Sequence, residues 1–169
     1  MQVSTWSPQT GSRNPSVVTG APVTVTGSPP TLSFMARDPD GYTDLRRLYF
    51  LVNSTPTVPP ASCHGFFDRG ANAVYLCNDT LTTLQGPLTP GSSGTLQNSQ
   101  YTIFGDRLAV VSAAGTDLAL NLGAGRRGEF AAGLHIHLAR RGRLHGSTAT
   151  VFPGELRHRQ RVWGLPRLL

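Results

Sequence analysis

The sequence feature that most constrains the fold is an acidic turn that opens directly into a long run of β-forming residues. The turn spans residues 38–44 and contains three aspartates, a proline and a glycine. The run that follows, 45–53, places Leu48, Phe50 and Val52 on one face by strand alternation. Further short segments are separated by Gly, Pro, Ser and Asn, which is typical of an all-β sandwich.

We expect several short strands and no helix before residue 125. The expected strands are 15–19, 23–26, 32–36, 45–53, 63–67, 73–77, 96–104, 108–112 and 118–122, with a hairpin turn at 68–72 and a loop at 86–94. Alternation predicts a core formed by Leu32, Phe34, Leu48, Phe50, Val52, Phe66, Val74, Leu76, Leu108, Val110, Leu118, Leu120 and Leu122.

Charge is distributed unevenly along the chain of 169 residues, which is long enough for one domain with a buried core. The first 125 residues contain six arginines and seven aspartates, whereas residues 126–169 contain nine arginines against Glu129 and Glu155. The net charge of +6 therefore belongs to the C-terminal segment, and the two parts are interpreted separately.

The organisation along the chain follows from this division. We expect a linker over residues 1–14, a β-sandwich domain over 15–125 with 138 as an alternative end, and a basic tail over 126–169. Residues 134–138 alternate and could dock as an edge strand. Residues 139–169 are Arg-rich without apolar periodicity, so we expect them to be disordered or poorly packed.

The sequence contains no apolar run near the roughly 20 residues that a membrane-spanning helix needs. It also lacks the G-x-S-x-G, Walker and H-E-x-x-H motifs, and only two glutamates are present. The N-terminal residues 1–8 have neither the basic start nor the apolar core of a signal peptide. These observations predict a non-catalytic chain without a membrane span. An exported module would be either an internal piece of a longer protein or a chain whose start codon is misassigned.

Two groups of residues are candidate metal ligands. Asp38, Asp40 and Asp44 lie on one tight turn, and hard carboxylate oxygens of this kind are what Ca²⁺ prefers. The alternative is a solvated turn that leads into a strand. His135 and His137 would share a strand face and could ligate a metal, although no third ligand is evident.

Six segments in order resemble an immunoglobulin-like module found in large secreted or surface proteins of soil bacteria, particularly acidobacteria. The segments are 14–18, 38–45, 51–54, 67–69, 72–79 and 91–100. The resemblance implies an immunoglobulin-like antiparallel β-sandwich that is secreted or at the cell surface. Its implied partners are the other domains of a multidomain extracellular protein, a polysaccharide or a surface protein.

The two cysteines leave their pairing open. Cys63 and Cys77 flank the expected hairpin at an even separation, so a loop of odd length would pair them across the strands. The resembled modules instead place a second cysteine at the position of Tyr101. Cys63 is then either the partner of Cys77 in a disulfide or a buried free thiol.

The sequence features fit three different functions. The first is a non-catalytic spacer, adhesion or ligand-presenting module of an extracellular protein. The second is a polysaccharide-binding accessory module, for which Trp6, Tyr42 or Tyr101 would supply a stacking platform. The third is nucleic-acid association through the arginine-rich tail, which would be weak and salt-sensitive because few aromatic residues accompany the charges.

The C-terminal segment departs from the resembled modules, which continue with a Tyr/Ile strand and a Trp-containing strand. Codons for residues 134–138 can encode Tyr-Ile-Tyr-Ile one base along, and our hypothesis is that a frameshift in GC-rich DNA replaced the last strands. A native basic tail is the alternative.

The frameshift hypothesis predicts that shifting the reading frame by one or two bases near Gly123 restores Tyr, Ile and Trp and removes most arginines. Resequencing codons 120–135 checks this, and Trp163 buried in a compact tail would contradict it.

Overall fold

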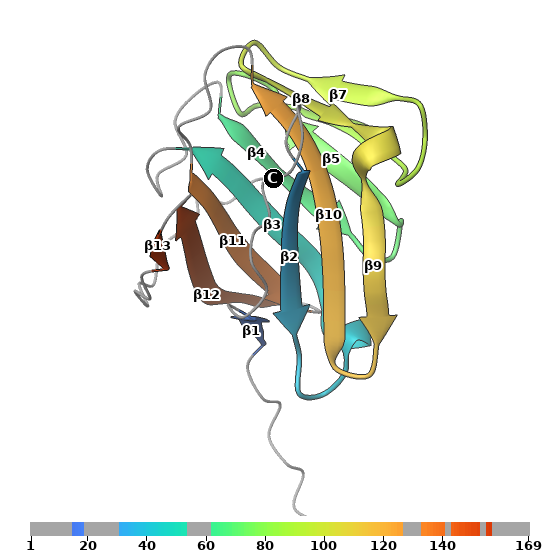
Figure 1. Cartoon of the computed structure of the whole chain (residues 1–169), viewed down its shortest axis with the longest axis vertical. Helices are drawn as coiled ribbons and strands as arrows, with labels where there is room; N and C mark the ends of the chain where they lie inside the picture. The colour runs from blue at the N-terminus through green and yellow to red at the C-terminus, as the bar shows by residue number, and fades with distance from the viewer. Residues whose placement is uncertain are drawn as a thin grey trace, which may run out of the picture.

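Two antiparallel β-sheets pack face to face in the computed structural model, as the sequence predicts (Figure 1). The structure describes residues 15–18, 31–53, 62–126, 133–140, 143–152 and 155–156. Within these ranges the helical elements are two 3₁₀ turns, η1 (Tyr42–Asp44) and η2 (Gly105–Arg107). No helix in the described part of the chain is long and apolar enough to cross a membrane.

The first sheet has six strands and is built around β10. Its order is β1-β2-β10-β8-β7, and β9 also pairs with β10. The strands are β1 (Ser16–Val18), β2 (Thr31–Arg37), β7 (Thr95–Gln97), β8 (Tyr101–Phe104), β9 (Ala109–Ala114) and β10 (Asp117–Arg126). β10 pairs with three neighbours, because its first part pairs with β2 and β9 and its last residues pair with β8.

The second sheet has seven strands in the order β13-β12-β11-β3-β4-β5-β6. Its strands are β3 (Leu45–Asn53), β4 (Cys63–Asp68), β5 (Ala73–Cys77), β6 (Leu84–Leu88), β11 (Gly133–Arg140), β12 (Arg143–Phe152) and β13 (Glu155–Leu156). Strands β3 to β6 form a meander in which each strand pairs with the next.

The core between the sheets follows the predicted alternation. Of the residues expected there, Val110 is only partly buried and packs against the core, and Phe66 is buried outside the core cluster. The other eleven belong to the buried core cluster. Gly65 of β4 is required inside it, because an added Cβ would lie 2.2 Å from the carbonyl oxygen of Tyr75 and 2.8 Å from Cζ of Phe50.

The strands differ from expectation in two places. The expected strand 96–104 is a hairpin of β7 and β8. Asn98 starts the tight turn between them, and its side-chain oxygen accepts hydrogen bonds from two backbone N–H groups of that turn. The expected loop 86–94 begins inside β6. The expected strand 23–26 lies outside the described residues, as does the expected linker 1–14.

The C-terminal segment differs from the expected secondary structure. β11 pairs with β3 on one side and with β12 on the other, so 134–138 is an inner strand and not an edge strand. Residues 143–152 and 155–156 are also strands, where we expected poorly packed chain. The sheet therefore extends to residue 156. The physical reason is that the free edge of β3 carries backbone donors and acceptors that another strand can pair. The frameshift hypothesis stays a prediction.

β9 is an edge strand with a local irregularity. Ser112 lies opposite Ala119 and Val110 opposite Leu120, so Val111 is an extra residue on β9. Such a bulge bends the strand and increases its twist. Val111 is 61% exposed as a result, and Figure 1 shows β9 at the outer edge of its sheet.

The side chain of Asn98 joins three segments of the sandwich. It is 8% exposed, and its Nδ2 donates to the carbonyl oxygens of Ser62 at 2.9 Å and Cys77 at 3.5 Å. Its Oδ1 accepts from the backbone N–H groups of Gln100 at 3.1 Å and Tyr101 at 2.9 Å. One amide thereby connects the start of β4 and the end of β5 in one sheet with the start of β8 in the other.

Replacing this amide should destabilise the fold. We expect Asn98→Ala to lower the free energy of unfolding by about 2–3 kcal/mol, because buried backbone groups lose their hydrogen-bond partners. Urea denaturation at constant m-value measures the loss. The control is Asn121→Ala, which removes one half-buried bond from Ser33 Oγ and should cost about 1 kcal/mol or less. Equal losses for the two variants would contradict the role assigned to Asn98.

Candidate ligand-binding face

Three aromatic rings form a row across the outer face of the second sheet. Tyr49 of β3 pairs with Phe66 of β4, which pairs with Tyr75 of β5. The ring centroids are 5.3 Å apart for Tyr49 and Phe66 and 5.1 Å apart for Phe66 and Tyr75, and the second pair is stacked. These residues alternate with the core residues of the same strands, so the row faces away from the first sheet.

The central ring of this row is covered and the outer rings are accessible. Phe66 is 7% exposed, and the guanidinium of Arg47 lies 4.6 Å from its centroid. Tyr49 and Tyr75 are half-buried. The face therefore offers two tyrosines, each with an apolar ring and a polar hydroxyl, on either side of a packed centre.

A charged pair adjoins the aromatic row. Arg47 Nε donates to Asp68 Oδ2 at 2.9 Å. Burial works to raise the pKa of Asp68, but hydrogen bonds from Arg47 and from the backbone N–H groups of Ala71 and Gly70 outweigh it and lower that pKa. Asp68 is therefore an anion at neutral pH that holds Arg47 over Phe66 and closes the turn after β4.

A second arginine lies at the same end of the sheet. Arg69 donates from Nε to the carbonyl oxygen of Leu45 at 3.0 Å and from Nη2 to that of Thr43 at 2.7 Å. Its guanidinium lies 6.0 Å from the ring centroid of Tyr42. Its partners in these two bonds are neutral carbonyl oxygens, which hold the guanidinium at this end of the sheet.

The structure does not support the predicted calcium site. Asp38 is fully buried, and its Oδ1 accepts the backbone N–H of Asp40 at 3.0 Å, so this carboxylate closes the turn. Asp40 is exposed and Asp44 is half-buried in η1. Within the described residues no three His, Cys, Asp or Glu side chains gather where they could hold a metal ion. The turn alternative explains these aspartates better.

The predicted histidine ligands lie on β11, where the backbone of His135 is opposite Leu51 and that of His137 is opposite Tyr49. Their strand is thus the neighbour of the aromatic row. The residues expected to form a stacking platform are elsewhere. Tyr101 is 4% exposed in the core, Tyr42 packs partly against the core, and Trp6 lies outside the described residues.

The predicted disulfide is not formed, and both cysteines are free and buried. Gly65 pairs with Leu76, which puts Cys63 and Cys77 on opposite faces of the sheet. The turn between β4 and β5 has an even number of residues, whereas direct pairing of the cysteines needs an odd number. A shift of one residue in register is enough to separate them.

Cys77 lies on the outer face beside His64, with 3.7 Å between Sγ and Nδ1. Burial raises the pKa of both Cys77 and Cys63. The neutral thiol is therefore favoured at both positions, whereas nucleophilic chemistry needs the thiolate. The side chains of Cys77 and His64 are close enough to contact, but a neutral thiol is not a nucleophile for which His64 would act as the base.

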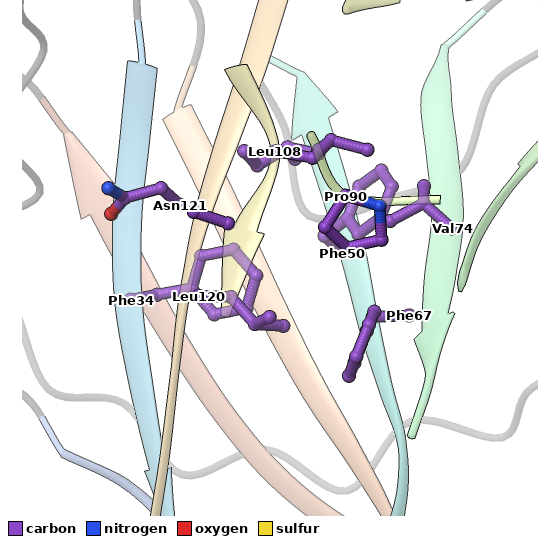
Figure 2. A pocket seen from close by; sticks show the side chains of 10 residues that line it. Phe34, Phe50, Phe67, Val74, Pro90, Leu108, Leu120 and Asn121 are labelled. Atoms are coloured by element: carbon purple, nitrogen blue, oxygen red, sulfur yellow. The ribbon is translucent and has the colours of Figure 1, made fainter. Parts of the chain in front are cut away.

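A small apolar cavity lies between the sheets (Figure 2). Its volume is about 10 Å³, and the side chains around it include Phe34, Phe50, Phe67 and Leu108. Sites for small organic ligands are usually about 300–1,000 Å³. This cavity is a packing gap of the core, and the outer face of the second sheet is the better candidate site.

Residues 123–128 match the spacing G-x-G-x-x-G, which binds dinucleotides when it forms a turn between a strand and a helix. Here Gly123 and Gly125 lie within β10, and an added Cβ on Gly123 would be 2.3 Å from Cβ of Arg107. Gly123 therefore allows close packing inside a sandwich.

The aromatic row was not expected from the sequence, although alternation in β3 already separates Tyr49 from the core residues.

The register makes a prediction about the thiols. In the native protein neither Cys63 nor Cys77 should react readily with an aromatic disulfide reagent, because both are buried and favour the neutral thiol. In denaturant without reductant, the same assay should detect two thiols per chain. A chain that shows no thiols under those conditions would contradict the register between β4 and β5.

No family model, no curated protein and no solved structure matches the chain. The fold assignment therefore stands on the two sheets themselves, which are consistent with an immunoglobulin-like β-sandwich.

Proposed function

We propose that this chain is a non-catalytic, ligand-presenting β-sandwich module of a larger extracellular bacterial protein. The single observation that carries the proposal is the aromatic row on the outer face of the second sheet. The row is defined as Tyr49, Phe66 and Tyr75. The ligand is a polysaccharide, whose sugar rings offer C–H faces to aromatic rings and hydroxyl groups to tyrosine.

The position of the row supports this function. The core already holds Phe34, Phe50 and Phe67, so the rings on the other face are not needed to fill it. A row fixed on three hydrogen-bonded strands is rigid, so little conformational entropy is lost when a ligand binds there. Rigid aromatic residues beside polar groups are the usual composition of binding surfaces.

The test is binding of the purified chain to a panel of neutral and anionic polysaccharides. Tyr49→Ala and Tyr75→Ala should each weaken binding by about tenfold, which corresponds to about 1.4 kcal/mol. The matched control is Val111→Ala, which removes an exposed apolar side chain from the other sheet and should change nothing. Tyr42→Ala should also retain binding, because that ring packs partly against the core.

Two results would contradict the proposal. Unchanged binding by both tyrosine variants would place the ligand elsewhere. Turnover of a polysaccharide by the purified chain would contradict the non-catalytic role. Thermal unfolding of each variant must accompany the binding data, since loss of fold would also abolish binding.

A further inference from the structure

We infer that the polysaccharide recognised by the aromatic row is anionic and carries carboxylate or sulfate groups. This inference rests on the function proposed above and adds the chemical class of the ligand. The observation behind it is a cluster of arginines at one end of the row. We call this cluster the basic rim and define it as Arg46, Arg47 and Arg69.

The basic rim adjoins the aromatic row through the backbone. Arg47 precedes Tyr49 by two residues on β3, and its guanidinium lies on Phe66. The backbone N–H of Arg69 donates to the carbonyl oxygen of Arg46 at 3.0 Å, so the turn after β4 brings the third arginine beside β3. A ligand that lies along the row reaches Arg47 at its end, next to the turn that carries Arg69.

Three arginines lie at this rim beside two aspartates, Asp68 and Asp44. Within the described chain, the salt bridges join Arg47 with Asp68 and Arg37 with Asp117, so Arg46 and Arg69 have no carboxylate partner there. Arg46 is exposed, and the Arg47 side chain is 37% exposed although it is paired. The guanidinium fork suits bidentate recognition of carboxylate and sulfate oxygens.

The backbones of two further arginines lie at the same end of the sheet. Arg140 at the end of β11 is opposite Leu45, and Arg143 at the start of β12 is opposite Arg140. Both lie at the end of the sheet where β3 begins. Where arginine charges gather, their potentials add and attract polyanions.

The rings favour a polysaccharide over a nucleic acid. Proteins that bind single strands stack successive bases on open aromatic faces. Here the central ring is 7% exposed and covered by Arg47, and the flanking tyrosines are half-buried. Partly covered rings with hydroxyl groups suit a chain of sugar rings that hydrogen-bonds along its length.

The experiment compares the full chain on dextran sulfate, on uncharged dextran and on single-stranded DNA at one salt concentration. The double variant R46Q/R47Q should lose at least about tenfold in affinity for dextran sulfate, as expected for losing charge-assisted hydrogen bonds. The control R37Q/R107Q also removes two charges, one of them from an exposed salt bridge, and should lose less than about twofold. Arg47→Lys keeps the charge without the fork and should fall between them.

Each outcome decides the inference. Equal losses in R46Q/R47Q and in R37Q/R107Q would mean that diffuse charge binds the polymer, and the inference fails. Tighter binding to DNA than to dextran sulfate would replace the polysaccharide with a nucleic acid. Equal binding to dextran and dextran sulfate would overturn the anionic class but leave the proposed function intact. Binding to no polysaccharide would overturn both, and matched melting temperatures for the two double variants exclude unfolding as the cause.

Discussion

The amide of Asn98 is the interaction on which the arrangement of the two sheets most depends. Its donors and acceptor satisfy backbone groups at the ends of three strands, two in one sheet and one in the other. An apolar interface alone allows the sheets to slide, since burial is not directional. A buried amide is satisfied in only one arrangement, because every unmade bond costs free energy. Apolar burial thus supplies most of the stability, and Asn98 fixes the relative position of the sheets.

The two faces of the second sheet use aromatic residues in different ways. Phe50 and Phe67 fill the core, whereas Phe66 packs between two tyrosines under a guanidinium. On the outer face, the ion pair with Asp68 keeps Arg47 in position over the ring. Two half-buried tyrosines flank this packed centre, and rigid aromatic rings beside polar groups are the physical reason to propose a binding role for the outer face.

Sequence reasoning predicted the strands whose alternation is strong and whose ends are marked by turn residues. β3 begins and ends where the acidic turn and the alternation place it, and most of the predicted core is buried. The register of β4 with β5 could not be predicted, because a turn of four or five residues fits the same composition and one residue decides the face of Cys77. The segment 134–138 was expected only as an edge strand, and β12 and β13 were missed. The pairing of this segment starts at the open edge of β3 and does not depend on local periodicity.

The extra residue at Val111 has a consequence for how the molecule behaves in crowded solution. β9 is an uncharged edge strand of Ala, Val and Ser, and a straight strand of this kind would be a template for adding strands from other molecules. The bulge interrupts the regular spacing of its donors and acceptors, so an incoming strand cannot stay in register along the whole edge. One inserted residue can thus keep this edge from growing into a fibril, a protection that needs no charged side chain.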